Sequence, residues 1–354
     1  MRPIHLPVMQ DVIDDWLMFR SMKQTHSSLS RSLSCIRKKK MSSPYPINSF
    51  FCLSNKRYQV HDHGLPLGVG SYATVYEAEK VIMSNTAVVS WSPDEPALVA
   101  KVTHLGTQKR HDSFHTERRV FSLLKREAQY PDHIIRCLDR YTINNHGVLI
   151  LERFKGVTLQ EHLACKGPLS ESDTVHCLRQ MVSALKFLHG KNIALRDLKA
   201  ENIAYDASTR TCTLFDFGLS SIIVAPGTVL QDGKGTPVYM PPEMLRGKFH
   251  DPIRSDYWAL GQLVFQMVTG RAMFGFCRDL DDLRSHVYQC EYFKGIDDYL
   301  NEADVSLGMK EVVLGLCAYR PERRWDLKQV EEWMNEEFGG DVETETSSNN
   351  GCDL

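Results

Sequence analysis

The chain has 354 residues, of which 42% are hydrophobic and 24% charged, and its formal net charge at pH 7 is −2. These values are typical of a folded globular protein, and no segment reaches the roughly 20 consecutive apolar residues that would span a bilayer. The 10 cysteines are scattered without a C-x-x-C pair, which excludes a zinc framework and a disulfide scaffold. The first residues lack the apolar core of a signal peptide, so we expect a soluble intracellular protein with reduced thiols.

The two ends of the chain differ from its middle. Residues 1–57 are basic and rich in serine, and residues 341–354 form an acidic tail; both are predicted to be disordered. Two interpretations of the basic cluster Arg37–Lys40 stay open: a solvated linker, which is the more common case, and a nuclear-import or anionic-surface patch. The expected location is therefore cytoplasmic, nuclear or both. Met41 follows the cluster and offers a start for a shorter product.

The first folded segment is LGVGSYATVYEAE (67–79), in which apolar and polar residues alternate on both sides of a glycine-dense turn. This pattern predicts a β-hairpin. Gly68 and Gly70 carry no Cβ, so backbone N–H groups of the turn can approach phosphate oxygens. A plain hairpin turn explains the glycines equally well. The hairpin setting argues against a dinucleotide-binding fold, in which such glycines open a helix.

The elements of the following hundred residues are predicted from their periodicity. Residues 81–96 contain two closely spaced prolines and are interpreted as a surface insertion. ALVAKVTHL (97–105) predicts a strand that carries Lys101, and the spacing of apolar residues over 113–127 predicts a helix that carries Glu117.

The carboxy-terminal half is predicted to be mostly helical. The apolar run 148–154 predicts one more strand, and residues 178–193 predict an amphipathic helix that stops at Gly190. The strongly apolar segment 255–270 predicts a helix in which Asp256 is interpreted as part of the core.

Two stretches, ALRDLKAEN (194–202) and LFDFG (214–218), carry the residues from which a reaction can be argued. Phosphoryl transfer from ATP needs a carboxylate that accepts the hydrogen bond of the attacking hydroxyl, a cation that meets the transferred charge, and oxygen ligands for Mg²⁺. Asp197, Lys199, Asn202 and Asp216 supply that set. A solvated, charge-rich turn would explain the first stretch alone, but not its combination with the second.

Together the two stretches resemble the catalytic loop and the metal-binding loop of eukaryotic protein kinases, as a divergent member of the serine/threonine subclass. The resemblance covers residues 58–340. It implies a two-lobed α+β fold, with a small β-rich lobe (58–152) that carries one main helix and a larger, mostly helical lobe (153–340). It also implies ATP and Mg²⁺ as cofactors and proteins with serine or threonine acceptors as substrates, without direct nucleic-acid binding.

The resemblance implies a role for each residue of the catalytic set. Asp197 corresponds to the catalytic base and Lys199 to the cation that contacts the transferred phosphate. Thr236 corresponds to the threonine that bridges these two in serine/threonine kinases. Asn202 and Asp216 correspond to the ligands of Mg²⁺.

The resemblance also implies where the nucleotide binds. Lys101 would contact the α- and β-phosphates and pair with Glu117, although Glu117 taken alone is equally well explained as a solvated helix residue. The remaining residues implied to contact the nucleotide are Leu67, Gly68, Val69, Gly70, Val75, Val99, Glu152 and Phe154.

Three departures from the family pattern keep a second hypothesis open. Ala73 replaces the third glycine of the phosphate loop, Val99 replaces an alanine, and Leu195 replaces a histidine that braces the metal loop. Leucine keeps the packing and loses a hydrogen bond worth roughly 0.5–1.5 kcal/mol. We predict an active kinase because Asp197 and its partners are retained. The alternative is a pseudokinase, a scaffold or allosteric partner with little or no turnover.

Two further contacts are implied by the resemblance. Arg196 would meet a phosphate on the segment that follows Asp216, an arrangement that orders this segment. Glu243 would be buried against Arg324 as a structural ion pair. The hydroxyl groups available for that phosphate are those of Ser220, Ser221 and Thr228.

Overall fold

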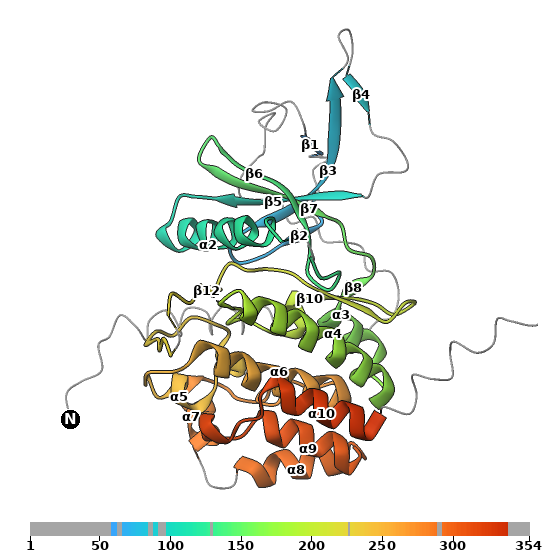
Figure 1. Ribbon diagram of the computed structural model, residues 1–354, viewed down its shortest axis with the longest axis vertical. Helices are drawn as coiled ribbons and strands as arrows, with labels where there is room; N and C mark the ends of the chain where they lie inside the picture. The colour runs from blue at the N-terminus through green and yellow to red at the C-terminus, as the bar shows by residue number, and fades with distance from the viewer. Residues whose placement is uncertain are drawn as a thin grey trace, which may run out of the picture.

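Figure 1 shows the computed structural model of the chain, which describes residues 58–61, 66–83, 88–90, 97–127, 130–225, 227–288 and 292–338. The predicted extension 1–57, with Arg37–Lys40 and Met41, and the predicted tail 341–354 lie outside the described residues. Within the described ranges, no helix is both long enough and apolar enough to cross a membrane.

The amino-terminal lobe is an antiparallel β-sheet with one helix packed against it (Figure 1). The strand order is β1-β3-β5-β7-β6, and both β2 and β4 pair with β3. The elements are β1 (Tyr58–His61), β2 (Gly68–Val69), β3 (Thr74–Met83), β4 (Val88–Ser90), β5 (Leu98–His104), α2 (Gln108–Leu124), β6 (Cys137–Ile143) and β7 (His146–Glu152).

The alternation of side chains along β5 decides which of them reach the helix. Leu98, Ala100 and Val102 belong to a small core on one face of the sheet, whereas Val99 belongs to the large core that includes the buried residues of α2. Successive side chains of a strand point to opposite faces. Lys101 therefore lies on the same face as Val99, toward α2.

Helix α2 begins earlier than the sequence pattern predicts. Thr107 caps it by accepting a hydrogen bond from the N–H of Arg110 at 3.4 Å, so the helix starts at Gln108 and not at residue 113. Capping of this kind satisfies backbone donors that have no partner within the helix. The buried residues recur at helical spacing and form the face toward the sheet: Ser113, Phe114, Glu117, Val120, Phe121 and Leu124.

The distance between α2 and the sheet depends on Gly147 in β7. A Cβ added at Gly147 would lie 2.5 Å from ring atoms of Phe114, which is 1% exposed. Protein interiors are packed too densely to absorb such an overlap without movement. Glycine at this position therefore lets α2 lie close against the sheet.

Part of the segment interpreted as a surface insertion is β-structure, which the interpretation did not predict. Strand β3 continues to Met83, and β4 pairs with it in antiparallel register from Val81↔Ser90 to Met83↔Val88. The two prolines lie in 91–96, outside the described residues. Strand β4 ends at Ser90, before the first of them.

The carboxy-terminal lobe is mostly helical (Figure 1). Its elements are β8 (Val157–Thr158), α3 (Leu159–Lys166), α4 (Glu171–Gly190), β9 (Ile193–Ala194), the 3₁₀ turn η2 (Ala200–Asn202), β10 (Ile203–Asp206), β11 (Thr211–Leu214), β12 (Ser221–Ile222), η3 (Pro237–Tyr239), α5 (Pro242–Leu245), α6 (Pro252–Thr269), α7 (Leu280–Tyr288), α8 (Tyr292–Glu302), α9 (Leu307–Leu316), η4 (Pro321–Arg323) and α10 (Leu327–Phe338). The α+β class with a β-rich and a helical lobe is confirmed.

Two long helices, α4 and α6, have well-defined ends. Ser170 caps α4, which therefore begins at Glu171 and not at 178 as predicted; its end at Gly190 is as predicted. Asp251 caps α6 by accepting from the N–H groups of the first turn, and Gly270 ends the helix with a left-handed φ of 70°. A left-handed residue after the last turn is a common helix stop, and glycine adopts it without strain. Both helices contribute to the large core, which also includes Leu195 and Leu198 of the predicted catalytic loop.

Candidate active site

The turn of the β2–β3 hairpin is exposed. Gly68 pairs with Val75, and the N–H of Gly70 closes the turn by donating to the carbonyl of Ala73 at 2.8 Å. A Cβ added at Gly68 would meet no protein atom within 4 Å, so internal packing does not require glycine there. This is compatible with the predicted phosphate contact, which stays a prediction. The exposed residues are Leu67, Gly68, Val69 and Gly70.

Lys101 lies at the centre of a buried charge cluster that joins the two lobes. Its Nζ is 2.8 Å from Oε2 of Glu117 in α2 and 3.0 Å from Oδ1 of Asp216. Burial alone would lower the pKa of Lys101, but the two carboxylates outweigh it and raise this pKa. Lys101 is therefore a permanent cation that connects α2 with the loop around Asp216, and Glu117 is not the solvated helix residue of the alternative interpretation.

The loop around Asp216 is fixed from two sides. Asp216 has a left-handed φ of 71° and accepts from the N–H of Gly218 at 3.0 Å. Burial alone would raise its pKa, but the charge of Lys101 and these hydrogen bonds lower it, so the carboxylate is ionised. Phe217 is fully buried and meets the ring of Phe121 edge-on at 5.3 Å.

The predicted catalytic residues form one hydrogen-bonded network. Asp197 Oδ1 accepts from the N–H of Thr236 at 3.1 Å and from its hydroxyl at 2.7 Å. Asp197 Oδ2 lies 2.7 Å from Lys199 Nζ and accepts from Asn202 Nδ2 at 3.0 Å. Lys199 also donates to the hydroxyl of Thr236 at 2.6 Å. Both carboxylate oxygens of Asp197 are thus held in place by three other members of the predicted set.

Asn202 and Asp216 fit the predicted Mg²⁺ site by their chemistry. The amide nitrogen of Asn202 donates to Asp197, to its carbonyl at 2.9 Å and to its carboxylate, which leaves the amide oxygen as the ligand atom. Asp216 adds an ionised carboxylate. Mg²⁺ prefers oxygen ligands and takes only one or two from the protein when phosphate oxygens complete its shell.

The predicted purine site lies where β7 ends. Val99 and Leu151 face each other across the β5–β7 pair. The N–H of Glu152 donates to the backbone carbonyl of Arg136 at 3.1 Å, so this donor already has a partner within the protein and is not available to the purine. Phe154 stacks on Phe215 with ring centroids 5.2 Å apart. The predicted contacts to the purine edge therefore depend on the carbonyl of Glu152 and the backbone of Phe154.

Asp256 lies in the core, as predicted, but its contacts with the backbone of a distant loop were not predicted. This fully buried carboxylate in α6 accepts from the backbone N–H of Leu195 at 2.8 Å and of Arg196 at 2.7 Å. It also contacts His189 Nε2 at 2.8 Å. Arg196 has a left-handed φ of 70°, an unusual conformation for a non-glycine residue that the two bonds hold in place. The carboxylate therefore shapes the start of the catalytic loop, although its sequence context indicated only core packing.

Leu195, at the position of the expected histidine, is packed within the large core. It is 1% exposed and belongs to the large core. Its carbonyl accepts from the hydroxyl of Ser220 at 3.3 Å, and its N–H is held by Asp256. The backbone around this departure is thus anchored on both sides.

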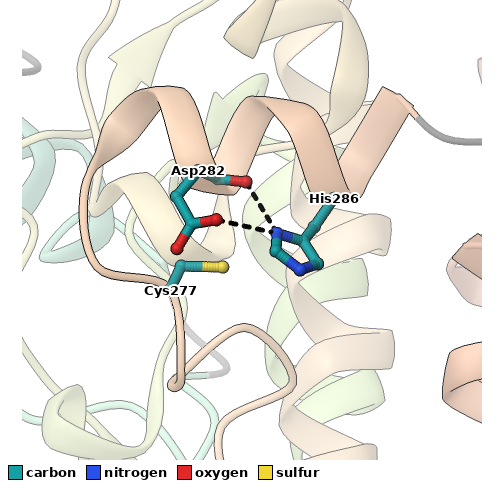
Figure 2. A group of neighbouring side chains, drawn as sticks. All are labelled: Cys277, Asp282 and His286. Atoms are coloured by element: carbon teal, nitrogen blue, oxygen red, sulfur yellow. Dashed lines mark hydrogen bonds and ion pairs between the residues drawn. The ribbon is translucent and has the colours of Figure 1, made fainter.

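A second group of potential metal ligands lies on α7 and the loop that precedes it (Figure 2). Among the described residues, ligand atoms of Cys277, Asp282 and His286 lie within 4.8 Å of one another. Asp282 already accepts from Arg278, from its N–H at 2.9 Å and from its Nε at 3.2 Å. His286 Nδ1 lies 2.8 Å from the carbonyl of Asp282. Because the guanidinium supplies the positive charge, these contacts account for the cluster without a metal ion.

The lobes, the buried lysine–carboxylate cluster and the Asp197 network together define the class of protein. The family model described as "Protein kinase domain" matches residues 62–337, and the chain belongs to this family.

Two relatives from Dictyostelium discoideum show the level of similarity. A probable myosin light chain kinase is 30% identical over 212 residues, which cover 58% of this chain and 53% of the relative. The probable serine/threonine-protein kinase MARK-B is 31% identical over 235 residues, which cover 65% of this chain and 32% of the relative. The matched part is therefore about half or less of each relative's own length.

Proposed function

We propose that this protein is an active serine/threonine protein kinase that transfers the γ-phosphoryl group of ATP to serine or threonine hydroxyls of proteins. The observation that carries the proposal is the network around Asp197. Its carboxylate is contacted by Thr236, Lys199 and Asn202. Both relatives have names that describe protein kinases. The cytoplasm or the nucleus stays the proposed location.

The arrangement explains how the residues would act on a bound substrate. The carboxylate of Asp197 is held by donors on both oxygens, so it can orient a substrate hydroxyl without first being reorganised. Burial alone would lower the pKa of Lys199, but Asp197 and neighbouring carboxylates raise it, so its ammonium group remains charged beside the site of transfer. Bound Mg²⁺, held by Asn202 and Asp216, would neutralise phosphate charge.

The structure of the catalytic loop supports turnover over the pseudokinase alternative. Leu195 favours that alternative because leucine lacks the hydrogen bond of the expected histidine. In the structure, the neighbouring backbone is held by Asp256 and Ser220, and the Lys101–Glu117 pair is formed. A residue that merely packs at 195 is therefore compatible with an ordered catalytic loop.

The proposal predicts Mg²⁺-dependent protein phosphorylation. Purified protein is incubated with γ-labelled ATP and a generic basic protein, with Mg²⁺ or with a chelator in excess. We expect label on serine or threonine residues only when Mg²⁺ is present, because the oxygen ligands of Asn202 and Asp216 require the ion to hold the phosphates. Mass spectrometry identifies the acceptor residues. Absence of Mg²⁺-dependent label would favour the pseudokinase.

Lys101→Met is expected to weaken binding of ATP about 10- to 100-fold, because hydrogen bonds to a charged group are worth about 1.5–3 kcal/mol. Thermal shift measures this directly, since a ligand that binds only the folded state raises the melting temperature. Lys166→Met, at an exposed lysine in the last turn of α3, is the matched control and should keep the full shift. An unchanged shift in Lys101→Met would remove Lys101 from the nucleotide site.

A further inference from the structure

The guanidinium of Arg196 is buried and already has a carboxylate partner. Its side chain is 2% exposed, and its two terminal nitrogens bind the two carboxylate oxygens of Asp232, Nη1 to Oδ2 at 3.2 Å and Nη2 to Oδ1. Nη1 also donates to the hydroxyl of Ser221 at 3.0 Å. A two-pronged pair of this kind is the strongest geometry an arginine makes with an anion.

The charge of Arg196 is balanced at this site by Asp232. Burial alone would raise the pKa of Asp232, but the hydrogen bonds and charge of Arg196 lower it, so the carboxylate is ionised. His250 packs nearby and is 2% exposed. Burial and the positive charge of Arg196 lower the pKa of His250, which keeps the imidazole neutral at pH 7. A buried guanidinium without a partner would be strongly destabilising, and Asp232 removes that cost.

Only five residues, 232–236, separate the contact of Asp232 with Arg196 from the contact of Thr236 with Asp197, the proposed catalytic base. Gly235 follows with a φ of 131°, and a Cβ there would lie 2.9 Å from the carbonyl of Arg196. The next residue, Thr236, binds Asp197 through its N–H and its hydroxyl. The stretch 232–236 therefore lies along Arg196 and Asp197, with Asp232 at one end and Thr236 at the other.

The hydroxyls expected to carry a phosphate make other contacts. Ser220 is 6% exposed and donates to the carbonyl of Leu195, and Thr228 donates to the carbonyl of Ala225 at 2.6 Å. Ser221 is the one that touches Arg196, but a phosphate there would place a second anion beside Asp232. Arg196 was expected to meet a phosphate, but in the structure its partner is the carboxylate of Asp232.

We propose that Asp232 is a positioning residue that takes the place of an activating phosphate, so that the segment 232–236 holds Thr236 against Asp197 without any phosphorylation. This inference rests on the proposed kinase activity. It states that the chain is active as synthesised, with Asp232 acting through Arg196.

The first test compares wild type before and after treatment with a phosphatase. Mass spectrometry of the peptides covering 216–243 verifies that no phosphate remains. We expect the rate of labelling to stay within about twofold, a change of roughly 0.4 kcal/mol in the barrier. If the treated enzyme loses its activity and regains it only after rephosphorylation, the inference is wrong while the proposed function stands.

The second test replaces the carboxylate. Asp232→Asn is expected to lower kcat about 100-fold, the loss typical of a misplaced catalytic group, with the KM for ATP nearly unchanged. Asp232→Glu should restore most of the rate because it keeps the charge. Asp298→Asn, at an exposed aspartate of α8, is the control for the loss of one charge and should equal wild type. Equal rates for Asp232→Asn and wild type would overturn the inference.

A third measurement does not depend on activity. Lys234 is exposed and lies within the stretch 232–236, so trypsin cleavage after Lys234 reports how firmly the stretch is held. We expect faster cleavage there in Asp232→Asn than in wild type or Asp298→Asn, measured at a temperature well below the melting transition of all three proteins. Equal cleavage in all three proteins would overturn the inference, whether or not the proteins transfer phosphate. Absence of phosphoryl transfer in wild type would contradict the proposed function instead.

Discussion

Asp197→Asn is expected to lower the rate of phosphoryl transfer about 10²- to 10⁴-fold, the usual contribution of a positioned general base. The amide is nearly the same size as the carboxylate but carries no charge. It replaces one acceptor oxygen by a donor, next to a lysine and a threonine that donate to this site. The measurement is the initial rate of transfer of label from ATP to protein at saturating ATP.

The control for this variant is nucleotide binding. Lys101, Glu117 and Asp216 do not contact the side chain of Asp197 in the network described above, so the thermal shift with ATP and Mg²⁺ should be close to that of wild type. A rate equal to wild type would remove Asp197 from catalysis. A lost rate together with a lost thermal shift would show that the variant damages the whole site.

Arg324→Met is expected to lower the free energy of unfolding by about 3–5 kcal/mol, because it leaves the carboxylate of Glu243 buried without its partner. The predicted pair is formed: Arg324 donates to Glu243 from Nη1 at 3.1 Å and from Nη2 at 3.2 Å. Nη1 also donates to the carbonyl of Arg254 at 2.8 Å, and the guanidinium lies 5.2 Å from the ring centroid of Trp258. Unfolding in urea, followed by circular dichroism, measures the loss.

Two companion variants show whether the loss comes from the unpaired charge. Adding Glu243→Gln to Arg324→Met should recover part of the stability, since the amide is cheaper to bury than a carboxylate. Lys328→Met breaks the exposed pair with Glu332 at 3.3 Å and should change stability by only about 0.3–0.5 kcal/mol. A loss below 1 kcal/mol in Arg324→Met, comparable to this control, would contradict the assignment of a buried structural pair.

The sequence predicted correctly those strands and loops whose structure depends on residues close together in the chain. The short apolar run 97–105 predicted the strand that carries Lys101, and the spacing of Asp197, Lys199 and Asn202 predicted their common loop. Helix starts were placed too late because the caps, Thr107 and Ser170, are single polar residues outside the periodic pattern. The β3–β4 hairpin was missed because prolines dominate the sequence just beyond it.

The features that could not be predicted depend on partners that are distant in sequence. Asp232 has no motif of its own, and its role appears only when the fold brings it to Arg196, 36 residues away. Asp256 lies in an apolar helix. A single acid there predicts burial, but it does not predict which groups bind the carboxylate, here the backbone N–H groups of a loop 60 residues earlier. A buried polar residue must find partners, so its presence in an apolar helix was the available signal.

The missing side chain at Gly147 has a consequence for how the active site can fail. The position carries no chemistry and lies in no motif, yet it governs how near the helix bearing Glu117 can come to Lys101. An added methyl group would overlap the ring of Phe114, so that either the ring or α2 would have to move. We therefore expect a substitution at Gly147, which is not itself one of the predicted site residues, to disturb the pairing of Glu117 with Lys101.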